Sequence, residues 1–372
     1  MLVELAFAKN ANTRNYSMKN ILLASTALVA FAGTAFAEGH AGISFTGSAD
    51  LGYNDTVAGD ENGFYSDLDL VAGFTAVLDN GLTAASSLNL DDLDDNNSSN
   101  GLDYSLSLKS ETATLTYGQT KFAAETHWTA AGDMESDGFS EADSEVALRG
   151  DVMLGTVSAS VSYALADADN AKNAIDDVTQ LSIGASTDLG NVNVVLAYQE
   201  DTLEAYTGNG DFNKSDVFGL SAGTSFGGAD VRVAYAEDNN SDSMGLKIAY
   251  PFGPVTVTAY LVSESVGDDN LGINLSYSNG PLAIALDIDD DQGTSKVGLE
   301  GSYDIGNGVM AYAGFLTQDD KDDRYYVAGS YDLGSGASLL VSYADDDSDV
   351  DGDEVGAGEY QVGTTVEVSF KF

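Results

Sequence analysis

An alternation of apolar and polar residues recurs from residue 38 to residue 372 and constrains the fold of this chain more than any other feature. In residues 360–372 one face carries Tyr, Val, Thr, Val, Val, Phe and Phe, and the other carries Gln, Gly, Thr, Glu, Ser and Lys. Residues 67–78 and 102–109 repeat the pattern. Because successive side chains of a β-strand point to opposite faces, this period of two predicts an all-β fold.

Two kinds of connection alternate between the predicted strands. Short ones contain Gly or Asn, which supply the positive φ of tight turns, and lie at 79–81, 188–191, 226–228, 251–254, 278–281, 304–308 and 332–336. Long acidic ones are expected at 54–66, 91–101, 119–143, 165–177, 200–214, 238–242, 264–269, 289–294, 318–323 and 345–358. The pattern predicts an antiparallel up-and-down sheet of 16–20 strands, and the number of hairpins favours the upper end.

Tyrosines mark both ends of the predicted strands. One set precedes tight turns (Tyr250, Tyr277, Tyr303, Tyr331) and another precedes acidic loops (Tyr163, Tyr198, Tyr235, Tyr343). Two aromatic girdles are typical of transmembrane β-barrels, in which closure also satisfies the backbone groups that an open edge would leave unpaired in lipid. A soluble β-sandwich or β-helix would explain the alternation but not the tyrosines at both strand ends.

The charged residues within the strands predict which face is wet. Basic residues fall in the polar phase of their strands: Lys109, Arg149, Arg232, Lys247, Lys296 and Lys371. A Lys or Arg that faced lipid at mid-depth would cost about 2–4 kcal/mol, so these six are predicted to line a lumen. The same face carries the acidic residues Asp67, Asp69, Asp103, Glu145, Glu300 and Glu367.

The overall composition excludes several functions. The formal net charge is −46 with only 14 Lys and Arg, which argues against nucleic-acid binding. The chain has no Cys and two His, His40 and His127, and we find no zinc pattern and no phosphate-binding glycine loop. His127 is expected to be a solvated loop residue. With no Ser/His or Asp/His pair to propose on the wall, the sequence predicts no catalytic residues and no enzyme.

The N-terminal segment has the pattern of an export signal. Met18, Lys19 and Asn20 form a short positive region, residues 21–32 are apolar, and Ala35 and Ala37 occupy the positions that a signal peptidase reads. We therefore expect an upstream extension at 1–17, a signal peptide at 18–37 and a single barrel domain at 38–372.

With these features the chain resembles the general diffusion porins of alphaproteobacterial outer membranes. The resemblance covers residues 38–372 and depends on "GISFTGSADLGY" (42–53), on hairpins such as "SYDLGSGASLLVSYAD" (330–345) and on the terminal "VEVSFKF" (366–372). It implies a homotrimer, usually of 16-stranded barrels. It also implies that Val368, Phe370 and Phe372 belong to a C-terminal signal for the outer-membrane assembly machinery.

The resemblance further implies that the third long loop, residues 119–143, folds into the lumen and narrows it. In such porins the loop acids face basic wall residues across the pore. Here the loop acids are Glu125, Asp133, Glu135, Asp137, Glu141 and Asp143. Arginines are scarce in residues 38–372, with only Arg149, Arg232 and Arg324, so the basic side of this field is expected to be weak.

The last acidic loop resembles a calcium-binding loop without matching one. Asp347, Asp349, Asp351 and Gly352 fit the start of an EF-hand loop, but the position of its bidentate Glu is Gly358. The flanking segments are predicted strands rather than helices, so only loose calcium binding by loop carboxylates is expected.

The sequence therefore predicts a passive aqueous channel for small hydrophilic solutes that prefers cations, because acids outnumber bases at both mouth and constriction. The alternative is a secreted or surface calcium-binding structural β-protein.

Overall fold

The computed structural model describes residues 41–56, 63–90, 103–142, 145–166, 177–202, 212–319, 321–345 and 360–372, which form 20 strands and one short helix. The elements are β1 (Ala41–Asn54), β2 (Gly63–Val77), β3 (Thr83–Leu90), β4 (Asp103–Lys109), β5 (Ala113–Gln119), α1 (Ala123–His127), β6 (Val146–Leu154), β7 (Val157–Ala166), β8 (Asp177–Leu189), β9 (Val192–Gln199), β10 (Val217–Phe226), β11 (Ala229–Asp238), β12 (Ser241–Phe252), β13 (Val255–Glu264), β14 (Asn270–Asn279), β15 (Leu282–Asp291), β16 (Thr294–Gly306), β17 (Val309–Gln318), β18 (Arg324–Gly334), β19 (Ala337–Asp345) and β20 (Gly363–Lys371).

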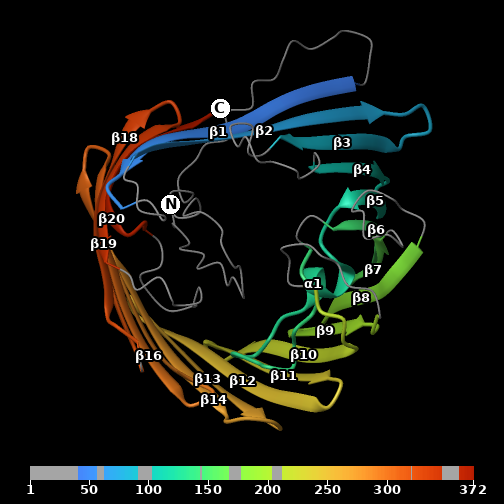
Figure 1. Ribbon diagram of the computed structural model, residues 1–372. Coiled ribbons are helices and arrows are strands. Elements are labelled where there is room, and N and C mark those ends of the chain that lie inside the picture. The colour runs from blue at the N-terminus through green and yellow to red at the C-terminus, as the bar shows by residue number, and fades with distance from the viewer. Residues whose placement is uncertain are drawn as a thin grey trace.

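The strands close into a barrel (Figure 1). Each strand pairs antiparallel with the next along the chain, and β20 pairs with β1 from Ser48↔Lys371 to Asn54↔Thr365. The predicted up-and-down barrel is confirmed, and its 20 strands exceed the 16 that the resemblance implied.

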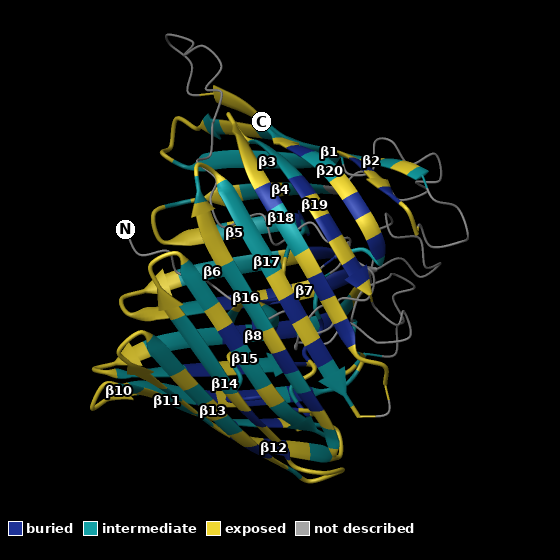
Figure 2. Cartoon of the chain, turned by 90° about the vertical axis from the view of Figure 1, so that its left-hand side faces the viewer, coloured by how far each residue is buried: buried dark blue, intermediate teal, exposed yellow. Residues whose placement is uncertain are grey.

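The two faces of the wall follow the alternation of the sequence. Exposed and buried residues alternate along β18, β19 and β20 (Figure 2). On the outside of β11 and β12, Val233, Leu246 and Ile248 are 41–50% exposed, although they lie in the middle of their strands. Apolar side chains left open in this way need a hydrocarbon surrounding, which is the pattern of a lipid-facing surface.

Tight turns join the strands where the sequence predicts them. In the connections β16–β17 and β18–β19, Asn307 and Gly308 have φ of 56° and 82°, and Ser335 and Gly336 have φ of 55° and 83°. Two consecutive positive φ angles give a turn whose twist matches that of antiparallel strands.

Two connections that we expected to be long acidic loops are tight turns instead. Only residues 239 and 240 separate β11 from β12, and only 292 and 293 separate β15 from β16. Asn239, Gln292 and Gly293 adopt positive φ there, so the flanking aspartates belong to the strands. The prediction failed because acidic residues at a strand end resemble a loop in composition.

The aromatic residues at the strand ends point outward as predicted. Tyr163 and Tyr343 at one end and Tyr250, Tyr303 and Tyr331 at the other are 37–48% exposed. Among the described residues, no helix is long and apolar enough to cross a membrane. The predicted extension and signal segment, residues 1–37, lie outside the described residues.

Candidate functional site

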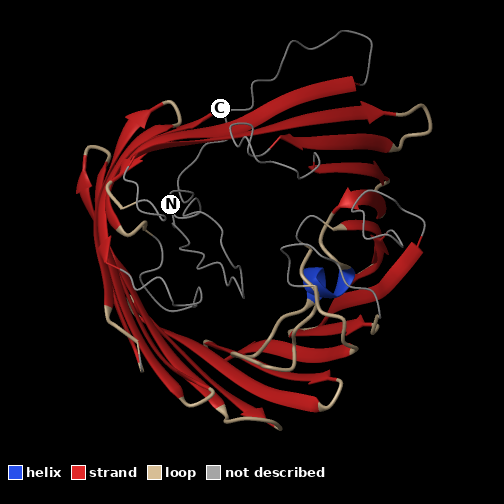
Figure 3. Cartoon of the chain, in the orientation of Figure 1, coloured by secondary structure: helices blue, strands red, loops and turns tan. Residues whose placement is uncertain are grey.

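The connection between β5 and β6 lies inside the barrel (Figure 3). We call its described residues 120–142 the inner loop. It contains α1, which packs against β7, β8 and β9. Phe122, Ala123 and Ala124 at its start are fully or nearly fully buried. The loop therefore takes up part of the barrel cross-section, in agreement with the prediction for residues 119–143.

Lumen-facing side chains of the wall accept hydrogen bonds from the loop backbone. The donors and acceptors are Ala123 N to Ser162 Oγ (2.8 Å), Ala124 N to Ser182 Oγ (2.8 Å), Ser136 N to Ser243 Oγ (2.9 Å) and Ser140 N to Gln199 Oε1 (2.6 Å). All four acceptors are buried. An irregular segment inside a barrel needs such partners, because a buried N–H without one costs free energy.

Glycines of the wall make room for the same loop. A Cβ atom on Gly184 would collide with Ala123 and His127, one on Gly219 with the Trp128 ring, and one on Gly245 with Ala131. We did not predict these positions as functional. Their signal in the sequence is a glycine in the lumen phase of a strand, where glycine otherwise weakens pairing and often marks a close approach of another segment.

Two of the predicted loop acids, Glu125 and Asp137, make contacts within the loop. Glu125 lies 2.7 Å from Lys121 Nζ and accepts hydrogen bonds from the backbone N–H groups of Phe122 and Ala142. Asp137 accepts a hydrogen bond of 2.8 Å from Trp128 Nε1. Glu141 is partly buried. Glu125 and Asp137 thus stabilise the loop, and Asp143 lies outside the described residues.

Two more of the loop acids, Asp133 and Glu135, face the wall at β15. One carboxylate oxygen each of Asp133, Glu135 and Asp291 lies within 4.8 Å of the other two, a spacing that could hold a cation. Lys296 Nζ lies 2.7 Å from Asp291, so a protein cation already stands beside the cluster. Asn270 Nδ2 donates to Glu135 Oε1 at 3.0 Å and thereby connects the loop to β14.

The basic residues predicted for the wall all lie in the lumen phase. Arg149 is 3.1 Å from Asp151 and also donates to the backbone oxygen of Lys121 at 2.9 Å. Arg232 donates to Ser221 Oγ at 3.0 Å, and Lys247 lies opposite it in register on β12. Lys109 is exposed near one strand end, whereas Lys371 Nζ is buried without a hydrogen-bond partner among the described residues. Arg149 and Lys296 are thus in ion pairs.

The acidic wall residues are spread over β2, β4, β16 and β20, with Glu145 just before β6. Asp67 lies opposite Asp50 in register, and Asp69 accepts a hydrogen bond from Ser48 at 3.3 Å. Glu367 and Glu300 each accept a hydrogen bond from a tyrosine, at 2.6 and 2.9 Å. Glu145 precedes β6 and is only 2% exposed, so it does not line open lumen. Asp103 pairs with Asn89 in register.

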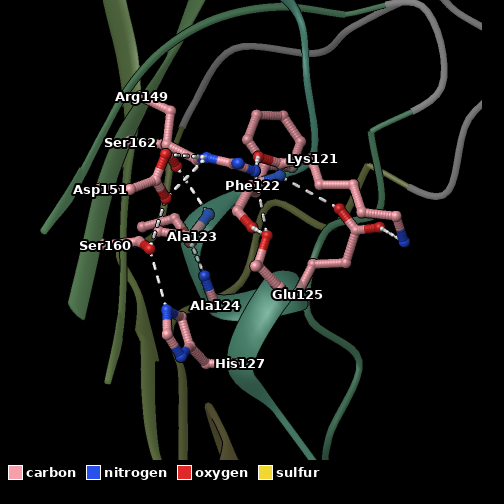
Figure 4. A network of polar contacts seen from close by, with 12 residues as sticks. Lys121, Phe122, Ala123, Ala124, Glu125, His127, Arg149, Asp151, Ser160 and Ser162 are labelled. Atoms are coloured by element: carbon pink, nitrogen blue, oxygen red, sulfur yellow. Dashed lines mark hydrogen bonds and ion pairs between the residues drawn. The ribbon is translucent and has the colours of Figure 1, made fainter. Parts of the chain in front are cut away.

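The structure places His127 against the wall rather than in solvent, contrary to our expectation. Its Nε2 lies 2.9 Å from Ser160 Oγ (Figure 4), and its Nδ1 lies 3.3 Å from Ser186 Oγ. Ser160 Oγ also donates to Asp151 Oδ1 at 2.7 Å. Burial lowers the pKa of His127, so the neutral imidazole is favoured.

This grouping of Ser, His and Asp, which we missed in the sequence, does not have the geometry of an activated nucleophile. In a hydrolytic triad the serine gives its proton to the histidine and the aspartate holds the histidine. Here Ser160 gives its proton to Asp151, so the histidine must donate to Ser160, and Ser160 is only 6% exposed. The arrangement holds α1 on the wall.

The remaining predicted sites lie at the C-terminal end. Phe370 and Phe372 are 46% and 47% exposed on the outer face, and Val368 shares their phase. The Phe372 backbone exchanges two hydrogen bonds with Gly47, at 2.8 and 3.0 Å, and so helps to close the barrel. The predicted calcium ligands Asp347, Asp349 and Asp351 lie outside the described residues.

Comparison with known proteins adds a family match. A family model described as Gram-negative porin matches residues 24–353. Two solved variants of the Rhodopseudomonas blastica porin are 18% identical in sequence to this chain, with a TM-score of 0.43, and the alignments cover 89% of this chain and 100% of theirs. A structure described as "Asymmetric conductivity of engineered proteins" aligns with the same coverage at 18% identity and a TM-score of 0.42. No curated protein matches.

Proposed function

Because the chain belongs to the Gram-negative porin family and is thus an outer-membrane channel protein, we propose that its lumen lets small hydrophilic solutes and ions diffuse passively and prefers cations. The inner loop supports a size limit, since buried hydrogen bonds to the wall fix it inside the barrel. Solutes then pass beside the loop.

The charge balance of the lumen supports the cation preference. Arg149 and Lys296 lie in ion pairs with Asp151 and Asp291, and two carboxylates, Asp50 and Asp67, lie opposite one another in register. Rings of acidic side chains favour cations in a channel because they concentrate them and repel anions. The net charge of −46 extends this bias to the whole chain.

Planar-bilayer recording with a salt gradient tests the proposal. The purified protein should give large ohmic current steps and a reversal potential of the sign for cations. The variant Asp133→Asn with Glu135→Gln should move the reversal potential towards zero. The matched control, Asp79→Asn with Glu111→Gln, removes the same charge from two tight turns and should leave it unchanged.

Anion preference would refute the proposed selectivity. No conductance from a correctly assembled barrel would refute the proposed channel. The alternative, a calcium-binding structural β-protein, predicts a protein that stays soluble without detergent after export. Recovery in the membrane fraction with heat-modifiable migration on a gel contradicts that alternative.

We also propose that the barrel is a homotrimer and is inserted by the outer-membrane assembly machinery. The exposed apolar residues Phe370 and Phe372 on the strand that closes the barrel support the second point. Truncation of Phe372 should lower the amount of barrel in the outer membrane, and cross-linking of intact membranes should give a band at three times the mass of the chain if the trimer forms.

A further inference from the structure

Three tyrosines of the lumen wall share one arrangement with their neighbours. Each tyrosine lies opposite a glycine on the next strand, and that glycine lies opposite a carboxylate on the strand beyond. The three rows are Tyr65, Gly52 and Glu367 on β2, β1 and β20; Tyr260, Gly272 and Asp289 on β13, β14 and β15; and Tyr326, Gly314 and Glu300 on β18, β17 and β16.

The side chains of each row are joined across the glycine. The tyrosine hydroxyl donates to the carboxylate two strands away, over 2.6 Å from Tyr65 to Glu367, 2.9 Å from Tyr260 to Asp289 and 2.9 Å from Tyr326 to Glu300. A tyrosine can span two strand spacings only if its ring lies along the wall rather than projecting into the pore, because neighbouring strands are about 4.8 Å apart.

Glycine is what permits this position of the ring. A Cβ atom on Gly52, Gly272 or Gly314 would collide with the ring of Tyr65, Tyr260 or Tyr326 respectively. All three glycines have ordinary φ and lie within strands, so the backbone does not require them. The requirement comes from the ring that covers them.

Each row also fixes the place of a negative charge. A hydrogen bond from a hydroxyl holds the carboxylate in one orientation, and such a bond is stronger when its acceptor is ionised. In register, Asp289 lies beside Lys296, whose Nζ lies 2.7 Å from the neighbouring Asp291. The rows of Glu367 and Glu300 continue to Leu340 and Ala285, so in the described part of the wall the next residue of each row carries no charge.

We propose that these three rows are selectivity elements of the channel: the tyrosine positions a carboxylate as a fixed attraction for cations, and the glycine keeps the ring out of the pore. The proposal rests on the proposed cation-preferring channel and extends it from the inner loop to the barrel wall. Tyr65, Tyr260 and Tyr326 are positioning residues, and Glu367 and Glu300 are the charges with most effect.

Bilayer recording of tyrosine variants tests the charge half of the proposal. Tyr65→Phe and Tyr326→Phe keep the ring and remove the hydroxyl, so the reversal potential in a potassium chloride gradient should shift towards zero while conductance stays close to that of the wild type. Tyr260→Phe should cause a smaller shift, because Lys296 lies beside Asp289. The matched control is Tyr312→Phe, whose register neighbours are Ser302 and Ala328 and whose hydroxyl lies 3.5 Å from Ser330.

Glycine variants test the steric half. Gly52→Ala and Gly314→Ala should lower single-channel conductance because the ring must turn into the lumen. The control Gly301→Ala changes a glycine that faces outward beside Glu300, where an added Cβ would only reach ordinary contact with Ala283. If a glycine variant does not assemble, the phenylalanine variants decide alone.

The outcomes separate this inference from the proposed function. A wild-type protein that does not conduct, or that prefers anions, overturns both. A cation-preferring wild type whose Tyr65→Phe and Tyr326→Phe variants keep the wild-type reversal potential overturns the inference only. A shift in these two variants and none in Tyr312→Phe supports it, since loss of packing alone would not move the reversal potential.

Discussion

Removal of the hydroxyls that hold the inner loop should convert a steady pore into a fluctuating one. The perturbation is a triple variant, Ser162→Ala, Ser182→Ala and Ser243→Ala. It takes the acceptors from the backbone N–H groups of Ala123, Ala124 and Ser136, which bond to them at 2.8, 2.8 and 2.9 Å. All six residues are at most 1% exposed, so water cannot replace the lost partners in the docked loop.

The size of the effect follows from the number of orphaned groups. Each buried donor left without a partner costs about 1–3 kcal/mol. Ser162 and Ser182 are neighbours in register and do not add independently, whereas Ser243 lies on β12. Two independent sites give about 2–6 kcal/mol against docking. Even the lower value changes the ratio of docked to undocked loop about 30-fold.

Single-channel recording measures the result. We expect brief partial closures that the wild type lacks, because an undocked loop can move across the pore. The matched control replaces three lumen-facing serines away from the loop path: Ser107→Ala, Ser276→Ala and Ser302→Ala. A triple variant with wild-type current and no added closures, from a barrel that assembles normally, would show that these hydrogen bonds do not hold the loop.

Two further predictions use Trp128, the single Trp of the chain, as a fluorescent reporter of loop docking. Gly219→Val puts a side chain where the Trp128 ring lies, so the Trp128 emission should shift to longer wavelength. The control Gly329→Val lies on the outer face and should not change the emission. Identical emission from both variants would argue against packing of the Trp128 ring on Gly219. Burial lowers the pKa of His127 from its ordinary 6.5, so a released loop binds a proton that the docked loop disfavours. Docking of the inner loop should therefore be complete above about pH 6.5 and weaken as the pH falls below this value. The Trp128 emission should then shift with pH in the wild type but not in His127→Gln. A pH response that persists in His127→Gln would refute the assignment of this effect to His127.

The in–out pattern of the wall was accessible from the sequence because it is local. Lys247 between Leu246 and Ile248 must point away from them, whatever the barrel around it, since the backbone of a strand alternates its side chains. The tight turns and the outward tyrosines followed from the same periodicity. The connections 238–242 and 289–294 were predicted wrongly, because aspartates such as Asp238 and Asp291 continue their strands up to a two-residue turn.

The roles of individual charges were less accessible. Glu125 is as acidic in sequence as Glu135, yet it accepts hydrogen bonds from the loop backbone whereas Glu135 faces Asp291. His127 was expected in solvent but lies against the wall, because a hydrogen-bond partner on the wall cannot be read from the loop sequence. A loop has no period, so its path over the wall depends on which pockets and acceptors the wall presents.

The sequence by itself determined the all-β architecture, the number of strands within a narrow range, and which side chains meet lipid and which meet water. Backbone geometry repeats every two residues, and any stretch of the chain shows this. Only the tertiary structure decided which lumen residues lie side by side. Tyr65 and Glu367 are 302 positions apart and meet across Gly52 because closure of the barrel sets the register of β1 with β20. That register depends on the stagger of all strands together, and no local pattern in the chain contains it.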